Sequence, residues 1–166
     1  MLTRLLSAIV LCLVVAAPSA ARSQGGADET PTVLAVVDRF MTAVSTNDTS
    51  ALSALRLEGG FNIVERPGEG GAMLVTRRTF APSTAKPGNY RERYWDPVVH
   101  VRGGIAVVWT PYEFWIDGKT SHCGIDVFDM VKEQGVWRIA NMMWTVEPSA
   151  CPGLRPSDPS RIRPVQ

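Results

Sequence analysis

The stretch of residues 105–147 constrains the fold of this chain more than any other part of the sequence. It is rich in β-branched and aromatic residues, and two turn signals, Asp117-Gly118 and Gln134-Gly135, divide it into three segments. Such segments, joined by two-residue turns, are typical of consecutive β-hairpins. The stretch therefore predicts an antiparallel sheet at the centre of the fold.

Two-residue turns would also set the register of this sheet. Counting outward from them, we expect Glu113 opposite His122, and Asp126 opposite Trp109 on one side and Met143 on the other. One face would then carry Trp109, Glu113, Trp115, His122, Asp126, Phe128, Met130, Asn141 and Met143, and the other Val108, Tyr112, Phe114, Cys123, Ile125, Val127, Val131, Met142 and Trp144.

Neither of these faces is polar enough to be a solvent face. Helices of the N-terminal part can cover one, and a second copy of the chain could cover the other, which makes a homodimer through the sheet an expectation. Pro111 lies in mid-strand and cannot donate to the ladder. It predicts an edge or a bulge there, and a bulge would reverse the faces upstream of it.

The first residues have the features of a targeting signal. Arg4 precedes an apolar run at 5–17 that is too short to span a bilayer, and small residues follow at 19–21. We expect residues 1–21 to be a signal peptide and 22–29 a flexible lead, so the mature chain would be periplasmic or secreted, with no membrane span. Cys12 is not expected to carry a lipid, because Leu11 precedes it.

Composition and length limit what the rest of the chain can be. After cleavage about 145 residues remain, enough for one domain with a sizeable core. We expect this domain at 30–147, followed by a Pro-rich extended tail at 148–166. The net charge is +1 and no basic stripe occurs, so we expect no nucleic-acid partner. No motif for a cofactor or a metal is present, and none is expected.

The N-terminal part of the domain reads as two helices. Thr30 and Pro31 predict a helix start, and apolar residues at 33, 36, 37, 40, 41 and 44 form one stripe. Asn47-Asp48 would end this helix and cap a shorter one, which stops at residues 58–60. Strands are expected at 61–65, 72–76 and 90–101, the last interrupted at Asp96-Pro97, and residues 81–89 read as a loop.

With the helices and hairpins placed, the sequence resembles the nuclear transport factor 2-like superfamily. The elements that carry the resemblance are W-x-P-Y-x-F at 109–114, D-G-K-x-S-H-C-G-x-D-x-F at 117–128 and G-x-W-x-I at 135–139. More narrowly, it is similar to the exported bacterial branch called lumazine-binding or polyketide-cyclase-like. The resemblance covers about residues 33–151. It implies an α+β fold, a cone-shaped curved antiparallel sheet wrapped on the N-terminal helices, with a cavity between them.

Three ionisable residues are candidates for acid–base chemistry. His122 beside Glu113 could transfer protons, with the carboxylate orienting the ring, or the two could form a structural ion pair. Asp126 lies among apolar residues, where an isolated charge is costly. It must have a partner, be protonated or line a wet cavity, and there it could serve as a general base.

Other residues are candidates for ligand contacts. Trp109, Tyr112 and Trp144 could stack on a flat ligand, although aromatic residues in strands more often belong to the core or an interface. Asn141 offers an amide that could bind a polar ligand edge or could only satisfy backbone groups. His122 and Cys123 are adjacent and would point to opposite faces, so they are a poor metal pair.

Cys123 and Cys151 are the two cysteines of the expected mature chain. In an oxidising compartment they could form a disulfide, or both could remain buried free thiols; spacing alone leaves both open.

Three functions follow, in order of preference. The first is an exported domain that binds a small apolar or aromatic molecule. The second is an isomerase-, dehydratase- or cyclase-like enzyme that uses Asp126, His122 and Glu113. The third is a dimeric interaction module without a ligand.

Overall fold

The computed structural model describes residues 28–81, 84 and 87–164, so the expected signal peptide lies outside the described residues. In chain order the elements are α1 (Thr30–Thr46), α2 (Thr49–Leu55), β1 (Arg56–Pro67), η1 (Glu69–Gly71), β2 (Met73–Thr79), β3 (Tyr90–Trp95), β4 (Val98–Arg102), β5 (Ile105–Ile116), β6 (Lys119–Glu133), β7 (Val136–Thr145), α3 (Cys151–Leu154), η2 (Pro159–Arg161) and β8 (Ile162–Arg163). None of the helices in this part of the chain is long and apolar enough to cross a membrane.

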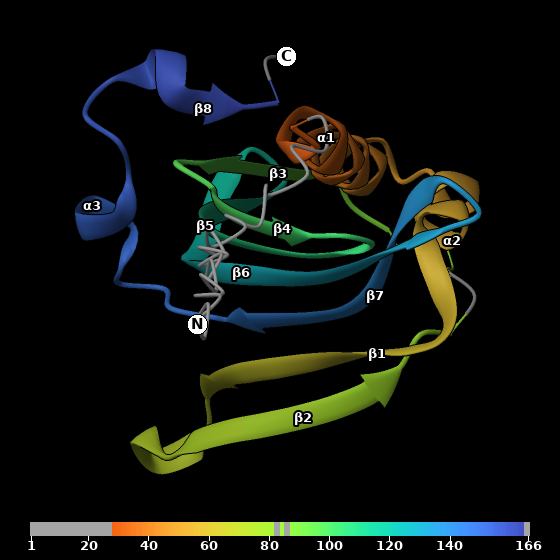
Figure 1. Cartoon of the computed structure of the whole chain (residues 1–166). Helices are drawn as coiled ribbons and strands as arrows, with labels where there is room; N and C mark the ends of the chain where they lie inside the picture. The colour runs from red at the N-terminus through yellow and green to blue at the C-terminus, as the bar shows by residue number, and fades with distance from the viewer. Residues whose placement is uncertain (1–27, 82–83, 85–86, 165–166) are drawn as a thin grey trace, which may run out of the picture.

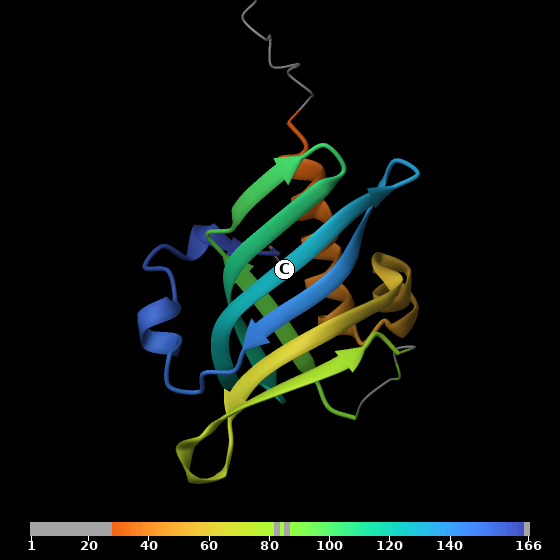
Figure 2. The same ribbon diagram turned by 60° about the horizontal axis from the view of Figure 1, so that its bottom comes forward.

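A curved, open sheet forms the body of the molecule. Its strands follow the order β2-β1-β7-β6-β5-β3-β8, with β4 beside β5, and every pair is antiparallel except β1 and β7. Helix α1 lies across one face, which we call the inner face (Figure 1). Figure 2 views the sheet from its other side, the outer face, with α1 behind it. The α+β fold expected from the sequence is therefore confirmed, with one parallel pair in the sheet.

Helix α1 follows the predicted apolar stripe. Val33, Val37 and Met41 have no exposed surface and pack with inner-face residues of the sheet. The helix begins at Thr30; Glu29 occupies the cap position and makes no side-chain cap hydrogen bond. The helix ends at Asn47, which is left-handed at φ 54°, as a helix terminus with Asn often is.

Asp48 caps the second helix through a hydrogen bond from the Ala51 backbone N–H. This helix ends at Leu55, earlier than the expected stop at residues 58–60. The expected strands at 61–65 and 72–76 lie within β1 and β2, and residues 90–101 divide into β3 and β4 around Asp96-Pro97.

Both two-residue turns form where they were expected. Asp117 and Gly118 have φ of 49° and 77°, and Gln134 and Gly135 have φ of 50° and 83°. Positive φ at both central residues is typical of the type I′ turn, whose backbone twist matches that of the two strands it joins. The turns therefore start the register as predicted, with Ile116 opposite Lys119.

A bulge at Ser121, three residues after Gly118, then changes that register. Trp115 pairs with Thr120, but Phe114 pairs with His122, so Ser121 is the extra residue. The expected pairing of Glu113 with His122 is wrong, because one inserted residue moves every later side chain to the other face. Glu113 lies opposite Cys123 instead.

The expectations at Pro111 and Asp126 also change. Pro111 pairs with Ile125 without a bulge; on the other side of β5 it falls between the partners supplied by β3 and β4, where the ladder is already interrupted. A second irregularity, between Asp129 and Met130, places Asp126 opposite Trp144 rather than Met143. On its other side Asp126 faces Thr110, not Trp109.

The C-terminal tail is folded onto the domain rather than extended. A disulfide joins Cys151 in α3 to Cys123 in β6, with the two Cα atoms 5.1 Å apart. The indole N–H of Trp95 donates to the Leu154 carbonyl at 2.7 Å, and Arg163 in β8 pairs with Asp38 of α1 at 2.6 Å. The Pro-rich composition suggested an open tail, but these specific contacts fix it along one edge of the sheet.

Candidate functional site

A cavity of about 760 Å³ lies between the two N-terminal helices and the inner face of the sheet. Much of its wall is apolar, formed by Phe40, Val44, Leu52, Phe114, Met142 and Trp144. A largely apolar cleft of this size, with a few polar groups converging on it, is the usual form of a small-molecule site. The polar residues that line it include the two acids Glu92 and Asp126, His122 and three arginines.

Asp126 is the most unusual of these residues. Only 1% of its surface is exposed, and its Oδ2 atom has no hydrogen-bond partner among the residues that the structure describes. Burial raises the pKa of Asp126 well above its ordinary value of 3.8, and the neighbouring Glu92 carboxylate raises it further. Both effects shift this side chain toward its protonated form relative to an exposed aspartate.

Glu92 is the second buried acid of the cavity, and the sequence analysis missed it. Burial raises the pKa of Glu92 to about 7, against the opposing charge of Arg56. Its position could have been found, because Tyr90 to Tyr94 alternate in β3. Tyr94 is fully buried against α1, so Glu92, two residues earlier, points to the same inner face.

His122 also lines the cavity, but without the carboxylate partner that was expected. Its Nδ1 lies 3.0 Å from the Ser121 hydroxyl, and its ring lies against those of Tyr112 and Phe114. Burial lowers the pKa of His122, and the positive charge of Arg66 lowers it further. The imidazole is therefore neutral at pH 7, the opposite of what a Glu113 partner would have produced.

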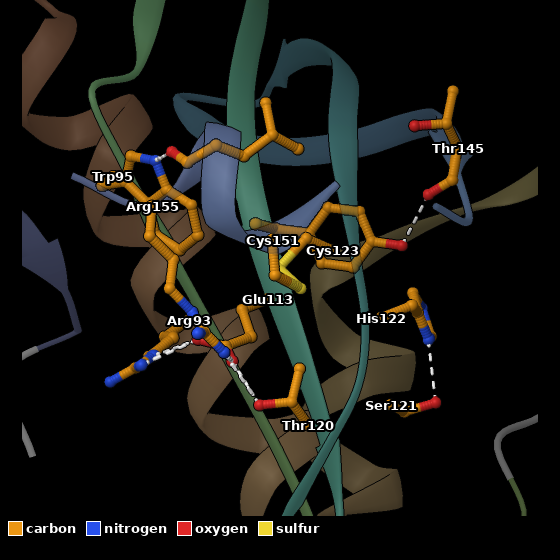
Figure 3. Close-up of a disulfide and its surroundings, with 12 residues drawn as sticks. Arg93, Trp95, Glu113, Thr120, Ser121, His122, Cys123, Thr145, Cys151 and Arg155 are labelled. Carbon is orange, nitrogen blue, oxygen red and sulfur yellow. Dashed lines mark hydrogen bonds and ion pairs between the residues drawn. A yellow bond between two sulfur atoms is a disulfide. The ribbon is translucent and has the colours of Figure 1, made fainter. Parts of the chain in front are cut away.

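Glu113 lies on the outer face and belongs to a different group of residues (Figure 3). Its carboxylate, fully buried, accepts hydrogen bonds from Arg93 at 2.7 Å, from Thr120 at 2.6 Å and from Arg155 of the tail. Burial alone would raise the pKa of Glu113, but these bonds lower it to about 2. Every interaction of this carboxylate favours its charged form, so it serves the fold rather than proton transfer.

The four expected ligand contacts are divided between the faces. Trp144 lines the cavity. Tyr112 is buried on the inner face, and its hydroxyl donates to the Thr145 carbonyl at 2.7 Å, so it acts as a core residue. Trp109 lies on the outer face and is 51% exposed, and Asn141 accepts a bond from the Phe61 backbone N–H. The bulges explain the last two, since they reverse the faces that the sequence predicted.

One group of potential metal ligands occurs in the described part of the chain. Glu113, Cys123 and Cys151 bring their ligand atoms within 4.8 Å of one another. The two sulfurs are bonded to each other and the carboxylate is engaged by two arginines. These donors do not fit a metal site, because a sulfur in a disulfide is no longer a thiolate ligand.

No protein-family model matches the sequence, and no curated protein sequence is significantly similar to it. An NTF2-like protein from Cytophaga hutchinsonii superimposes with a TM-score of 0.58 at 16% identity, over 72% of this chain and 99% of that one. A protein of unknown function with a cystatin-like fold, from Nostoc punctiforme, gives 0.54 at 11% identity, over 72% and 92%.

A beta subunit named for an aromatic-ring-hydroxylating dioxygenase, from Novosphingobium aromaticivorans, gives a TM-score of 0.56 at 12% identity, over 70% of this chain and 88% of that one. The chain therefore has the fold of nuclear transport factor 2-like proteins. At such identities the similarity establishes the fold alone, so function must be argued from the cavity.

Proposed function

We propose that this protein binds a small, partly apolar molecule in the cavity between its helices and the inner face of the sheet. The observation that carries the proposal is Asp126: a buried carboxyl at an apolar cavity whose Oδ2 lacks a partner among the described residues. A buried polar atom without a hydrogen bond costs roughly 1 to 3 kcal/mol. A ligand with a hydrogen-bonding group would remove that cost when it binds.

The apolar wall supports the same proposal. Phe40 and Met142 are buried, and beside them four partly buried wall residues keep apolar surface open to the cavity: Val44, Leu52, Phe114 and Trp144. Covering such surface with a ligand contributes about 25 cal/mol for each Å² removed from water. An aromatic or alicyclic body of moderate size suits a space of about 760 Å³.

We further propose that the protein works outside the cytoplasm, in the periplasm or the medium. The signal-like sequence at residues 1–21 motivates this, and the disulfide between Cys123 and Cys151 is consistent with an oxidising compartment. N-terminal sequencing of the exported protein should begin near Ala21 or Arg22. Recovery of only the intact chain from the cytoplasm would contradict the proposal.

A fluorescence titration with the neutral probe N-phenylnaphthylamine tests the cavity. The full chain should enhance its emission, and Val44→Trp, which fills the cavity, should abolish most of that signal. Trp109→Ala removes an exposed aromatic residue from the outer face and should leave binding unchanged. Native mass spectra of freshly purified protein would show any retained molecule. No probe binding, or equal binding by the Val44→Trp variant, would reject the cavity as a site.

An acid–base enzyme is the second candidate, with Glu92 in the place that Glu113 was expected to fill. The observation that favours it is the pKa of Glu92, about 7, beside Asp126 and the neutral His122. A group that titrates near the working pH is suited to both giving and taking a proton. Deuterium exchange from D₂O into the ketone β-tetralone, followed by NMR, tests it. Exchange above buffer that Asp126→Asn removes would support catalysis; exchange at the buffer rate would reject it.

A homodimer through the outer face is compatible with either function. Val98, Trp109, Val127 and Met143 pair in one row across four strands, and three of them are at least 38% exposed. Sedimentation of the parent and of Trp109→Glu tests the dimer. A parent that sediments as a monomer at high concentration would rule this interface out.

A further inference from the structure

The cavity carries its charges asymmetrically. The two acids are buried in it, whereas Arg66 and Arg78 are exposed residues that line it from β1 and β2. Among the described residues, neither of these arginines forms an ion pair with a carboxylate. The two guanidinium groups are thus available to a ligand, in contrast to Arg93, Arg155 and Arg163, which all have acidic partners.

The register of the sheet places Arg66 and Arg78 toward the opposite end of the cavity from Asp126. Asp126 pairs with Trp144, which pairs with Val64 of β1. Arg66 follows Val64 by two residues and so shares its face. Arg78 of β2 pairs with Asn62, two residues before Val64, and also lines the cavity. The two cations therefore flank the line that runs from Asp126 over Trp144 to the outer strands.

Asn62 adds a second unsatisfied polar atom beside Arg78. Its Oδ1 is buried and has no hydrogen-bond partner among the described residues. It lines the same cavity as Asp126 Oδ2. The cavity thus offers polar contacts at both ends, with Trp144 and Met142 between them.

We propose that the ligand is an organic anion, with a carboxylate or sulfonate-like group held by Arg66 and Arg78 and an apolar body lying over Trp144 toward Asp126. This rests on the proposed binding function and names the chemical class of its ligand. Arginine is suited to the role because its planar fork of N–H donors matches the oxygens of such groups, and charge-assisted bonds are roughly twice as strong as neutral ones.

A buried acid pair would ordinarily repel an anion, which makes its protonation state important. Burial raises the pKa of Glu92 to about 7 and that of Asp126 well above its ordinary value. Protonated carboxyls carry no charge and offer an O–H donor. Arg56, which is cationic, faces Glu92, and Tyr112 lies near both acids, while the neutral His122 lines the same cavity. The raised pKa values and the charge of Arg56 therefore reduce the negative charge that the inner end of the cavity presents to an entering anion.

Two fluorescent probes that share one aromatic body distinguish binding in the cavity from a preference for anions. Anilinonaphthalene sulfonate has the body of N-phenylnaphthylamine plus one anionic group. We expect the anion to bind the full chain at least tenfold more tightly than the neutral probe. The two probes should also compete for the cavity, so that excess neutral probe displaces the anion. Arg66→Gln and Arg78→Gln should each weaken binding of the anion about tenfold and leave the neutral probe unaffected.

Arg77→Gln is the matched control. Arg77 precedes Arg78 but points to the other face, where its guanidinium lies 4.1 Å from the centre of the Phe61 ring. This variant should bind both probes like the parent, and thermal melts should show all three variants folded. Affinity for the anion should also fall with added salt, since the contact is ionic.

The outcomes are distinguishable. If the neutral probe binds and Val44→Trp removes it, but the anion binds no more tightly and ignores Arg66→Gln and Arg78→Gln, the anion proposal is overturned and the binding function stands. If neither probe enters the cavity, both fail. Equal weakening by Arg77→Gln would show a general charge effect and would also overturn the anion proposal.

Discussion

Two buried carboxylates, Glu113 and Asp126, lie on neighbouring strands of one sheet and are treated in opposite ways. Glu113 faces outward and is bonded to Arg93, Arg155 and Thr120. Asp126 faces inward and keeps one oxygen without a partner among the described residues. Both are almost completely buried, so burial does not distinguish them. The two carboxyls differ in their hydrogen bonds: the fold supplies partners to both oxygens of Glu113, whereas Oδ2 of Asp126 has none among the described residues.

The pKa values follow the same division. Hydrogen bonds lower the pKa of Glu113 to about 2 despite its burial, whereas burial and Glu92 raise that of Asp126. A satisfied charge stabilises the folded chain, and an unsatisfied one costs stability unless it is protonated. Sites that give up stability in this way are candidates for function, while satisfied ion pairs are commonly structural.

The largest effect is expected from the disulfide that holds the outer site together. It closes a separation of 28 residues and ties α3, next to Arg155, to the strand that carries Cys123. The chain-entropy model values such a loop at roughly 3 to 4 kcal/mol. Urea unfolding of the Cys123→Ala/Cys151→Ala double variant should show this loss. A loss well under about 1 kcal/mol would mean that the tail is held by its ion pairs alone.

Glu113→Gln should have the next largest effect. It keeps the shape but leaves Arg93 and Arg155 facing a neutral amide. Breaking a fully buried pair costs about 3 to 5 kcal/mol; because these arginines are 20% and 40% exposed, water can solvate them and we expect roughly 2 to 3. Glu133→Gln is the control, since its pair with Arg138 is exposed and should be worth under about 0.5 kcal/mol. Equal, small losses for both would contradict a structural role for Glu113.

The two sites should also respond to pH in opposite directions. The pKa of Glu92 in the folded chain, about 7, lies above its ordinary 4.5, so the stability it contributes is complete below about 4.5 and is lost as pH rises through 7. The lowered pKa of Glu113 instead gives stability above 4.5 that is lost as pH falls toward 2. Because the pKa of His122 is lowered, its protonation costs stability as pH falls below 6.5.

The variant Glu92→Gln separates the contribution of Glu92 to pH-dependent stability from those of Glu113 and His122. Between about pH 5 and 8 the variant should gain roughly 2 kcal/mol relative to the parent, because the glutamine cannot ionise. Urea unfolding of both proteins across this range measures the difference. A gap that does not change with pH would show that Glu92 ionises as freely as it does in the unfolded chain.

The smallest effect is expected from Asp126→Asn. The amide is neutral and of the same size, so at pH 7 it should change the free energy of unfolding by less than about 1 kcal/mol in either direction. Thermal melts beside Glu113→Gln make the comparison directly. A loss as large as that of Glu113→Gln would place Asp126 among the structural carboxylates and remove the difference between the two faces.

The sequence predicted the elements well because their signals are local. The turn pairs at 117–118 and 134–135, the apolar stripe of α1 and the cap at Asp48 each follow from a few neighbouring residues. The two faces could not be predicted because they depend on bulges at Ser121 and near Met130, which carry no composition signal. A single inserted residue reversed Glu113 and Trp109 relative to the cavity.

The site was predicted only in part, because some of its residues stand out locally in the sequence and others do not. Asp126, His122 and Trp144 line the cavity, and the first stood out because a charge among apolar residues is rare wherever the register falls. Glu92 and Arg66 were missed, since each lies among polar neighbours and becomes unusual only when the fold brings it to the inner face. The alternation of Tyr90, Glu92 and Tyr94 was the one available signal.

Carboxyl-carbon NMR of the folded protein from about pH 3 to 8 tests the central difference most directly. We predict that the Glu113 resonance stays at its ionised position throughout, because its pKa is near 2. The Glu92 resonance should titrate near pH 7, and that of Asp126 well above its ordinary value of 3.8. If Glu92 and Asp126 both titrated near pH 4 in the folded chain, the cavity would hold ordinary solvated acids, and the distinction between the two faces would be wrong.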